Sequence, residues 1–199
     1  MIASNPAASI LLLLIAIPSL YALFKNPAFL ERGLLHPYSI VQGKNLQGLV
    51  TSAFLHANWA HLLFNLITFY FFAFALESTV GSGFFLVIYV VSWLVGDALT
   101  IWFHHRESGY YSLGASGAIS GVLFSFILFY PMEDIYLFLI PVGIPAWIFA
   151  ILYTGLSIYA SRQGYGQINH EAHLGGALGG VLATLVLIPD VIGHFLSHF

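Results

Sequence analysis

Long apolar stretches separated by short polar breaks recur along this chain, and they constrain its fold more than any other feature. A helix that crosses a bilayer needs about 20 mostly apolar residues. The stretches predict six helices, at residues 7–24, 59–76, 84–103, 115–130, 145–160 and 172–188. With 59% hydrophobic and only 7% charged residues, the chain has too few charges to cover a soluble surface. We therefore expect an all-α fold, a polytopic membrane helix bundle with six transmembrane helices.

The composition also limits the partners and the cofactors. The net charge of −3 provides no basic face, so we expect the lipid bilayer and no nucleic acid as a partner. The chain has no cysteine, which excludes disulfides and thiolate metal sites. No stretch has the composition of a soluble domain, and we expect residues 1–199 to form a single membrane domain. Its long first loop, 25–58, mixes apolar pieces with Pro and Gly, which is typical of a structured loop near the membrane interface.

A run of small residues opens the fourth predicted helix. Gly117 and Gly121 lie four residues apart, so they share one helix face and allow another helix to approach closely. Ser116 stands just before them. Its hydroxyl could bond to a backbone carbonyl of its own helix, or it could act as a nucleophile if a general base comes within reach.

Polar residues gather at the starts of the second, fourth and sixth predicted helices, which enter the bilayer from the same side. Polar side chains inside a bilayer are costly and mark functional sites by default. The sixth helix carries the pairs Gly175/Gly179 and Gly176/Gly180, so it and the fourth helix can pack backbone to backbone. That packing would bring a serine and a histidine within hydrogen-bonding distance. The residues in question are His56, His61 and Asn65, then Ser116, and finally His170 and His173.

Three motifs in this order resemble those of the rhomboid intramembrane serine proteases. The resemblance spans roughly residues 52–188, which would be the motif-bearing core. Its motifs are His61-Leu62-Leu63-Phe64-Asn65 for H-x-x-x-N, Gly114-Ala115-Ser116-Gly117 for G-x-S-G, and Ala172-His173-Leu174-Gly175-Gly176-Ala177-Leu178-Gly179 for A-H-x-x-G-x-x-x-G.

The resemblance implies a Ser-His dyad that cleaves transmembrane protein substrates and requires no cofactor or metal. Ser116 would be the nucleophile and His173 the general base and acid. His61, Asn65 and a backbone N–H at the serine would stabilise the oxyanion, and donors of that kind are what acyl transfer needs. His56 and Gly114 are further positions beside the site. The same resemblance implies an integral multi-pass membrane protein. We expect it in the bacterial cytoplasmic membrane.

The chain departs from the family pattern at two places. The family's first loop usually carries a Trp-Arg pair where this chain has Leu46-Gln47-Gly48. Many members place a tyrosine one turn after the nucleophile, against the catalytic imidazole, and this chain has Ser120 there. We expect Phe124 or an aromatic residue of the second helix to pack on His173 instead.

Several residues also allow structural interpretations. His61 and Asn65 could hold the long first loop against the bundle. Glu77 is expected to cap or clamp a helix end. Asp97, a lone carboxylate in the third predicted helix, could orient His173 as a third catalytic residue, but a structural hydrogen bond is the preferred interpretation.

Three other functions compete with the serine protease. A metal-dependent protease would explain the histidines, but His170-Glu171-Ala172-His173 is one residue shorter than H-E-x-x-H and loses its i, i+4 histidine pair. A non-proteolytic relative would bind transmembrane segments, although such proteins typically lack the serine or the histidine. A transporter would need matching broken helices, which the pattern does not indicate.

The orientation in the membrane has two conflicting indicators. All five basic residues follow the first, third and fifth predicted helices, on the side of the polar cluster. The positive-inside rule would place that side in the cytoplasm. In the family, the active site usually opens to the extracytoplasmic side. We follow the family and expect the polar cluster of this chain on that side.

Overall fold

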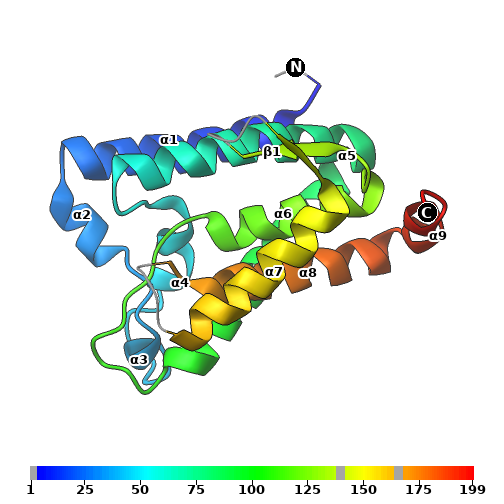
Figure 1. Cartoon of the computed structure of the whole chain (residues 1–199). Coiled ribbons are helices and arrows are strands. Elements are labelled where there is room, and N and C mark those ends of the chain that lie inside the picture. The colour runs from blue at the N-terminus through cyan, green and yellow to red at the C-terminus, as the bar shows by residue number, and fades with distance from the viewer. Residues whose placement is uncertain (1–3, 138–141, 164–167) are drawn as a thin grey trace.

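Helices make up most of the computed structural model, which describes residues 4–137, 142–163 and 168–199 (Figure 1). The long helices are α1 (Pro6–Phe24), α5 (Trp59–His104), α6 (Ser116–Phe129), α7 (Ala146–Gln163) and α8 (His170–Leu187). Each of the six predicted helices is present to within a few residues. Two of them, 59–76 and 84–103, lie within the single element α5. The short helices are α2 (Pro27–Arg32), α3 (Pro37–Ile40), α4 (Gly48–Thr51), the 3-10 turn η1 (Ser52–Phe54) and α9 (Val191–Leu196).

Helix α5 is broken at Gly81, where the chain folds back on itself. Gly81 has φ 79° and ψ 158°, a conformation that favours glycine because it has no side chain. Phe69 of the first half consequently contacts Phe85 and Tyr89 of the second half edge to face, with ring centroids 6.5 and 6.0 Å apart. The α5 element is therefore a pair of helices joined by a tight turn, as the separate predictions for 59–76 and 84–103 require.

The start of α1 is capped by a side chain of the α5 turn. The buried carboxylate of Glu77 accepts hydrogen bonds from the backbone N–H groups of Ala7 at 3.0 Å and Ala8 at 2.7 Å. The Ser82 hydroxyl donates to the same carboxylate. A negative charge at a helix N-terminus satisfies unpaired N–H groups and interacts favourably with the helix dipole. The prediction that Glu77 caps or clamps a helix end is confirmed, and the capped helix is α1.

Two described helices, α1 and α5, are long and apolar enough to cross a membrane. Helix α6 is apolar as well but has only 14 residues. At 1.5 Å per residue it extends about 21 Å, whereas the hydrocarbon core of a bilayer is about 30 Å thick. Helix α6 is therefore shorter than the thickness of that core.

A short β-hairpin joins α6 to α7, and here the all-α prediction is incomplete. Strand β1 (Asp134–Tyr136) pairs antiparallel with β2 (Gly143–Pro145). Pro145 precedes the first residue of α7 and disfavours extending that helix toward the N-terminus. Gly143 packs closely on the opposite strand, where an added Cβ would lie 2.7 Å from the Asp134 side chain. The local sequence thus favours extended chain over a longer helix.

Glycines on α8 face two different neighbours. Gly176 and Gly180 lie directly against the backbone carbonyls of Gly117 and Gly121 on α6, so close that a Cβ on either would overlap them. The intervening Gly179 lies against α5, where an added Cβ would be 3.1 Å from the Cα of Ser92. The predicted backbone contact between the fourth and sixth helices is confirmed, and the second glycine pair packs α8 against α5.

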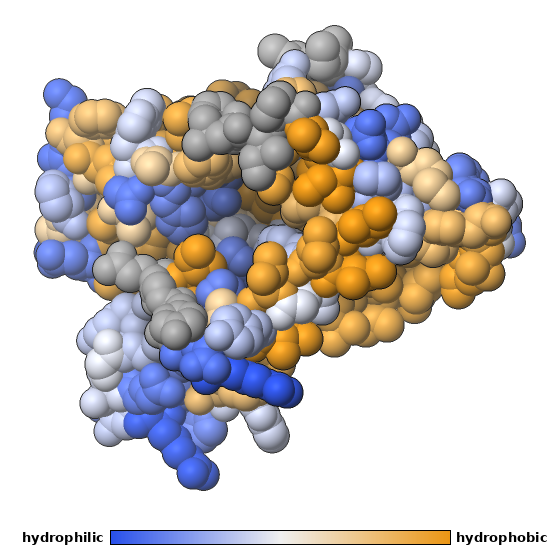
Figure 2. All heavy atoms as spheres, viewed as in Figure 1, coloured by the Kyte–Doolittle hydropathy of each residue, from blue (hydrophilic) through white to orange (hydrophobic). Residues whose placement is uncertain are grey.

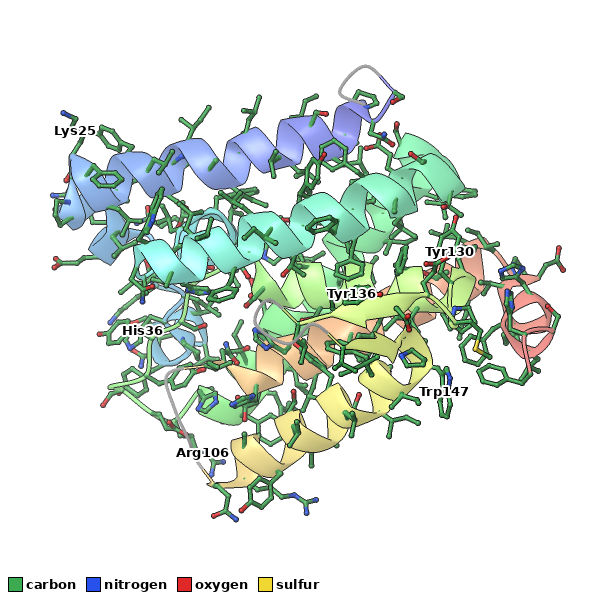
Figure 3. The ribbon with its side chains drawn as sticks, turned by 45° about the horizontal axis from the view of Figure 1, so that its top comes forward. Lys25, His36, Arg106, Tyr130, Tyr136 and Trp147 are labelled. Atoms are coloured by element: carbon green, nitrogen blue, oxygen red, sulfur yellow. The ribbon has the colours of Figure 1, made fainter. Side chains whose placement is uncertain are left out.

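The long first loop is structured, as predicted, and it packs over the ends of α5 and α6. Its Leu35 forms a β-bridge with Ser112 of the 105–115 connection, and His36 stacks on Tyr111 with ring centroids 4.2 Å apart. Figure 3 shows Lys25, His36 and Arg106 at this end of the bundle, and Tyr130 and Trp147 at the other. Hydrophilic side chains also gather near α3 at this end, while hydrophobic ones cover the region around α7 (Figure 2).

Candidate active site

The starts of α6 and α8 bring Ser116 and His173 into direct contact. His173 Nε2 lies 2.7 Å from Ser116 Oγ, although the two residues are 57 positions apart in the chain. Ser116 is the first residue of α6, and His173 lies in the first turn of α8, whose Asn169 side chain caps the helix by accepting from the Ala172 N–H. A serine hydroxyl within hydrogen-bonding distance of an imidazole is the arrangement that nucleophilic catalysis needs.

Gly114 brings His61 next to this pair. It has φ 128°, and a Cβ there would lie 2.8 Å from Cε1 and 3.0 Å from Nε2 of His61. Any side chain would therefore be strained by the backbone and would displace the imidazole. Its N–H donates to the Ser52 carbonyl at 2.9 Å, which fixes the turn before the serine. The glycine of the G-x-S-G motif thus has a steric explanation in this chain.

Asn65 belongs to a chain of buried hydrogen bonds that begins on α1. Its amide Nδ2 lies 2.7 Å from His56 Nε2, and because an amide nitrogen only donates, Nε2 must be the accepting nitrogen. The ring proton is then on Nδ1, which donates to Ser19 Oγ at 2.9 Å, while the Ser19 hydroxyl donates to the Phe54 carbonyl. This chain fixes the tautomer of His56 and the orientation of the Asn65 amide. His56 also contacts His61, with ring centroids 4.8 Å apart.

The residue that packs on His173 is Tyr153 of α7, and the expectation of Phe124 or an aromatic of the second helix is wrong. The Tyr153 ring stacks on the imidazole with centroids 6.3 Å apart and planes at 23°. Its hydroxyl hydrogen-bonds to Ser120 Oγ at 2.8 Å. Phe124 contacts Tyr153 instead, at 5.6 Å. Ser120 thus anchors the hydroxyl of the ring that stacks on His173.

A cavity of about 680 Å³ lies at the Ser116–His173 contact. Ser116, His173, His61 and Asn65 all contribute to its wall, so the four residues predicted for the site lie together. Asp97 also lines the cavity, but its carboxylate accepts from Trp93 Nε1 at 2.9 Å. The preferred interpretation of Asp97 as a structural hydrogen-bonding residue therefore has a partner, Trp93.

The side chains of the His170-Glu171-Ala172-His173 segment point in different directions. The His170 ring meets His173 edge to face at 6.4 Å, while Glu171 turns away to accept from Ser161 and to pair with His104 at 3.5 Å. Within residues 4–137, 142–163 and 168–199, no three side chains of His, Asp or Glu gather in a way that could hold a metal ion.

The sequence of this chain is similar to those of several known proteins. The chain is 30% identical over 171 residues to Rhomboid protein 1, mitochondrial, of Saccharomyces cerevisiae, an alignment that covers 84% of this chain and 49% of that protein. It is 33% identical over 147 residues to Rhomboid protease GluP of Bacillus subtilis, covering 74% and 27%. It is 28% identical over 134 residues to Rhomboid protease GlpG of Haemophilus influenzae, covering 67% and 65%.

The chain thus spans about half the length of the mitochondrial relative it matches. Residues 43–190, which include every motif of the site, match the Rhomboid domain family. That match covers well over half of the 199 residues, from the long first loop to the end of α8. The chain belongs to the rhomboid family.

Proposed function

We propose that this protein is an intramembrane serine endopeptidase in which Ser116 is the nucleophile and His173 the general base and acid. The observation that carries the proposal is the 2.7 Å contact between Ser116 Oγ and His173 Nε2 inside a cavity of about 680 Å³. The two side chains come from different helices whose backbones touch at glycines, so the contact is built into the packing of the bundle.

The reaction follows the usual course of acyl transfer. Ser116 Oγ attacks the carbonyl carbon of the scissile bond while its proton moves to His173 Nε2. The tetrahedral intermediate collapses when that proton passes to the leaving amine, which departs and leaves an ester on Ser116. Water then attacks the ester, giving a proton to His173, and the proton returns to Ser116 as the acid product leaves.

The oxyanion is assigned to three donors: the His61 imidazole, the second N–H of the Asn65 amide, and a backbone N–H at Ser116. His61 and Asn65 line the same cavity as Ser116, and Asn65 is held in a fixed orientation by His56. In a dry site, loss of one such donor costs roughly 10²–10³-fold in rate.

The substrates proposed are transmembrane segments of other proteins. We assign six spans to α1, the two halves of α5, α6, α7 and α8, and we treat residues 1–199 as one membrane domain with its core at about 52–188 and its long first loop at 25–58. The bacterial cytoplasmic membrane remains our prediction for its location. Two of the relatives come from bacteria, whereas the yeast relative is named as mitochondrial.

Cleavage of a model single-span substrate by the purified protein in detergent tests the proposal. Ser116→Ala and His173→Ala should each reduce cleavage more than about 10³-fold, and a fluorophosphonate probe should label the wild type but not Ser116→Ala. The exposed Ser197→Ala and His198→Ala on the C-terminal segment serve as matched controls. Unchanged cleavage in either dyad variant would overturn the assignment. Substrate binding without any cleavage would indicate a binding protein, and inhibition by a chelator alone would indicate a metalloprotease.

A further inference from the structure

Asp97 is the one acidic residue among the described residues that line the Ser116–His173 cavity. It lies on the second half of α5, next to Gly96, where an added Cβ would be 2.8 Å from the Ala172 carbonyl oxygen. Asp97 is therefore level with the first turn of α8, the turn that carries His173. A carboxylate at this depth is costly and calls for a function.

The Asp97 carboxylate is held in place but only partly satisfied. Trp93 Nε1 donates to Oδ2 at 2.9 Å, and Trp93 is itself fixed by an edge-to-face contact with Phe54, with centroids 5.8 Å apart. A carboxylate can accept about four hydrogen bonds. Within the described chain, Trp93 is the hydrogen-bond partner of Asp97. The contacts found there between an imidazole and a carboxylate join His104 to Glu107 and Glu171 and do not involve Asp97.

Asp97 does not serve the dyad directly. The imidazole of His173 contacts Ser116, Tyr153 and His170, and no bond joins it to Asp97 in the described structure. The carboxylate thus offers an unused acceptor to whatever occupies the cavity. Under the proposed function, on which this inference rests, the occupant is a segment of a peptide substrate.

We propose that Asp97 forms a substrate subsite that binds a side chain carrying N–H donors, such as lysine, arginine or glutamine, close to the scissile bond. A buried acceptor left without a donor disfavours a substrate with an apolar side chain at that position. Because transmembrane segments contain few polar side chains, one donor at the correct position distinguishes a substrate from the many apolar segments around it. The subsite thus adds sequence selectivity to the dyad.

Binding to the inactive Ser116→Ala protein tests the subsite without relying on cleavage. The probes are fluorescent single-span peptides in detergent, each with Lys, Gln or Met at one position, moved stepwise through the membrane-surface end of the segment. At one position, Lys and Gln should bind about tenfold more tightly than Met, a typical value for a hydrogen bond to a charged group. Adding Asp97→Leu should abolish both preferences over Met. The isosteric Asp97→Asn should retain the preference for Gln over Met, because its amide oxygen still accepts, and should lose the preference for Lys over Met, because it carries no charge.

Asp190→Asn, an exposed acidic residue at the start of α9, is the control and should leave every preference unchanged. Equal binding of the Lys, Gln and Met peptides at all positions would overturn the subsite. So would a preference for Lys and Gln that persists unchanged when Asp97→Leu or Asp97→Asn is added to Ser116→Ala. Donor-selective binding together with a wild type that never cleaves would overturn the protease assignment and leave the subsite intact.

Discussion

Tyr153 of α7 stacks on the imidazole of His173 and at the same time hydrogen-bonds through its hydroxyl to Ser120, one turn after Ser116. One side chain from a third helix therefore connects the two helices of the dyad. Only Ala146 and Ser157 of α7 are fully buried, so this helix is the most exposed of those around the site. The orientation of His173 consequently depends on the position of a helix that is weakly packed against the bundle.

We predict that Tyr153→Phe lowers kcat several-fold and Tyr153→Ala about tenfold or more, because a misoriented base is costly even at small displacements. Ser120→Ala should match Tyr153→Phe, and the double variant should be no worse than either, since both remove the same bond. KM should change little for the Phe variant. Tyr159→Phe, an exposed tyrosine on the same helix, is the control. Additive losses in the double variant would contradict the shared bond.

The hydrogen-bonded chain from Ser19 to Asn65 predicts an effect on catalysis from a residue of α1. Ser19→Ala removes the acceptor of His56 Nδ1–H, so nothing fixes the tautomer in which His56 Nε2 accepts from the Asn65 amide. We expect kcat to fall roughly 10-fold, within the range for weakening one oxyanion donor, while the melting temperature drops by a few degrees. Ser9→Ala, on the same helix but near its start, should retain full activity. Loss of stability without loss of kcat in the folded protein would assign Ser19 a purely structural role.

Gly176→Ala should destabilise the bundle and abolish cleavage. The new Cβ would overlap the Gly117 carbonyl, and relieving that overlap must move α8 and with it His173. Overpacking of this kind costs about 1–3 kcal/mol. Gly155→Ala on α7 is the matched control, because nothing lies within 4 Å of its added Cβ. Thermal unfolding and cleavage should be measured together, and full activity of Gly176→Ala would show that the helices can separate without harming the dyad.

Glu77→Gln should lower the melting temperature while the folded fraction stays active. The carboxylate accepts from Ala7 N–H, Ala8 N–H and the Ser82 hydroxyl, and an amide has one oxygen fewer for these donors and no charge for the helix dipole. A loss of about 1–2 kcal/mol is expected from charge-assisted bonds of this kind. The exposed Glu133→Gln is the control. An equal decrease in both variants would contradict the capping role.

A reporter fused after Phe199 tests the orientation. The C-terminal α9 lies against α6 near Phe129, where His194 Nε2 contacts the Phe129 carbonyl at 2.8 Å, at the end opposite Ser116. We predict a cytoplasmic reporter, which places the cavity mouth on the outer side as the family orientation requires. A reporter active only outside would mean that the basic residues at the mouth, including Lys25 and Arg106 (Figure 3), determine the orientation.

The helices could be predicted from the sequence because they depend on strong local signals. Apolar stretches set the helix bounds, and the break at Gly81 follows from its position between two such stretches. The contact of Ser116 with His173 could be predicted because glycines on both helices require close approach. Tyr153 was missed because its helix carries no motif and its place depends on how α7 lies across the bundle. The available signal was Ser120, a small polar residue at the position where the family resemblance leads one to expect a tyrosine.

Helix α6 extends only about 21 Å at 1.5 Å per residue, and it is enclosed by neighbouring helices, with most of its 14 residues buried. In the six-span arrangement that we propose, this short, enclosed helix would place Ser116 below the headgroup plane. Under the proposed function, a substrate helix must leave the hydrocarbon and expose a peptide bond that was hydrogen-bonded within its own backbone. The free energy needed to unwind that segment becomes part of the reaction barrier. Segments with glycine or proline need less of it, so the enzyme selects its substrates partly by how weakly their own helices hold together.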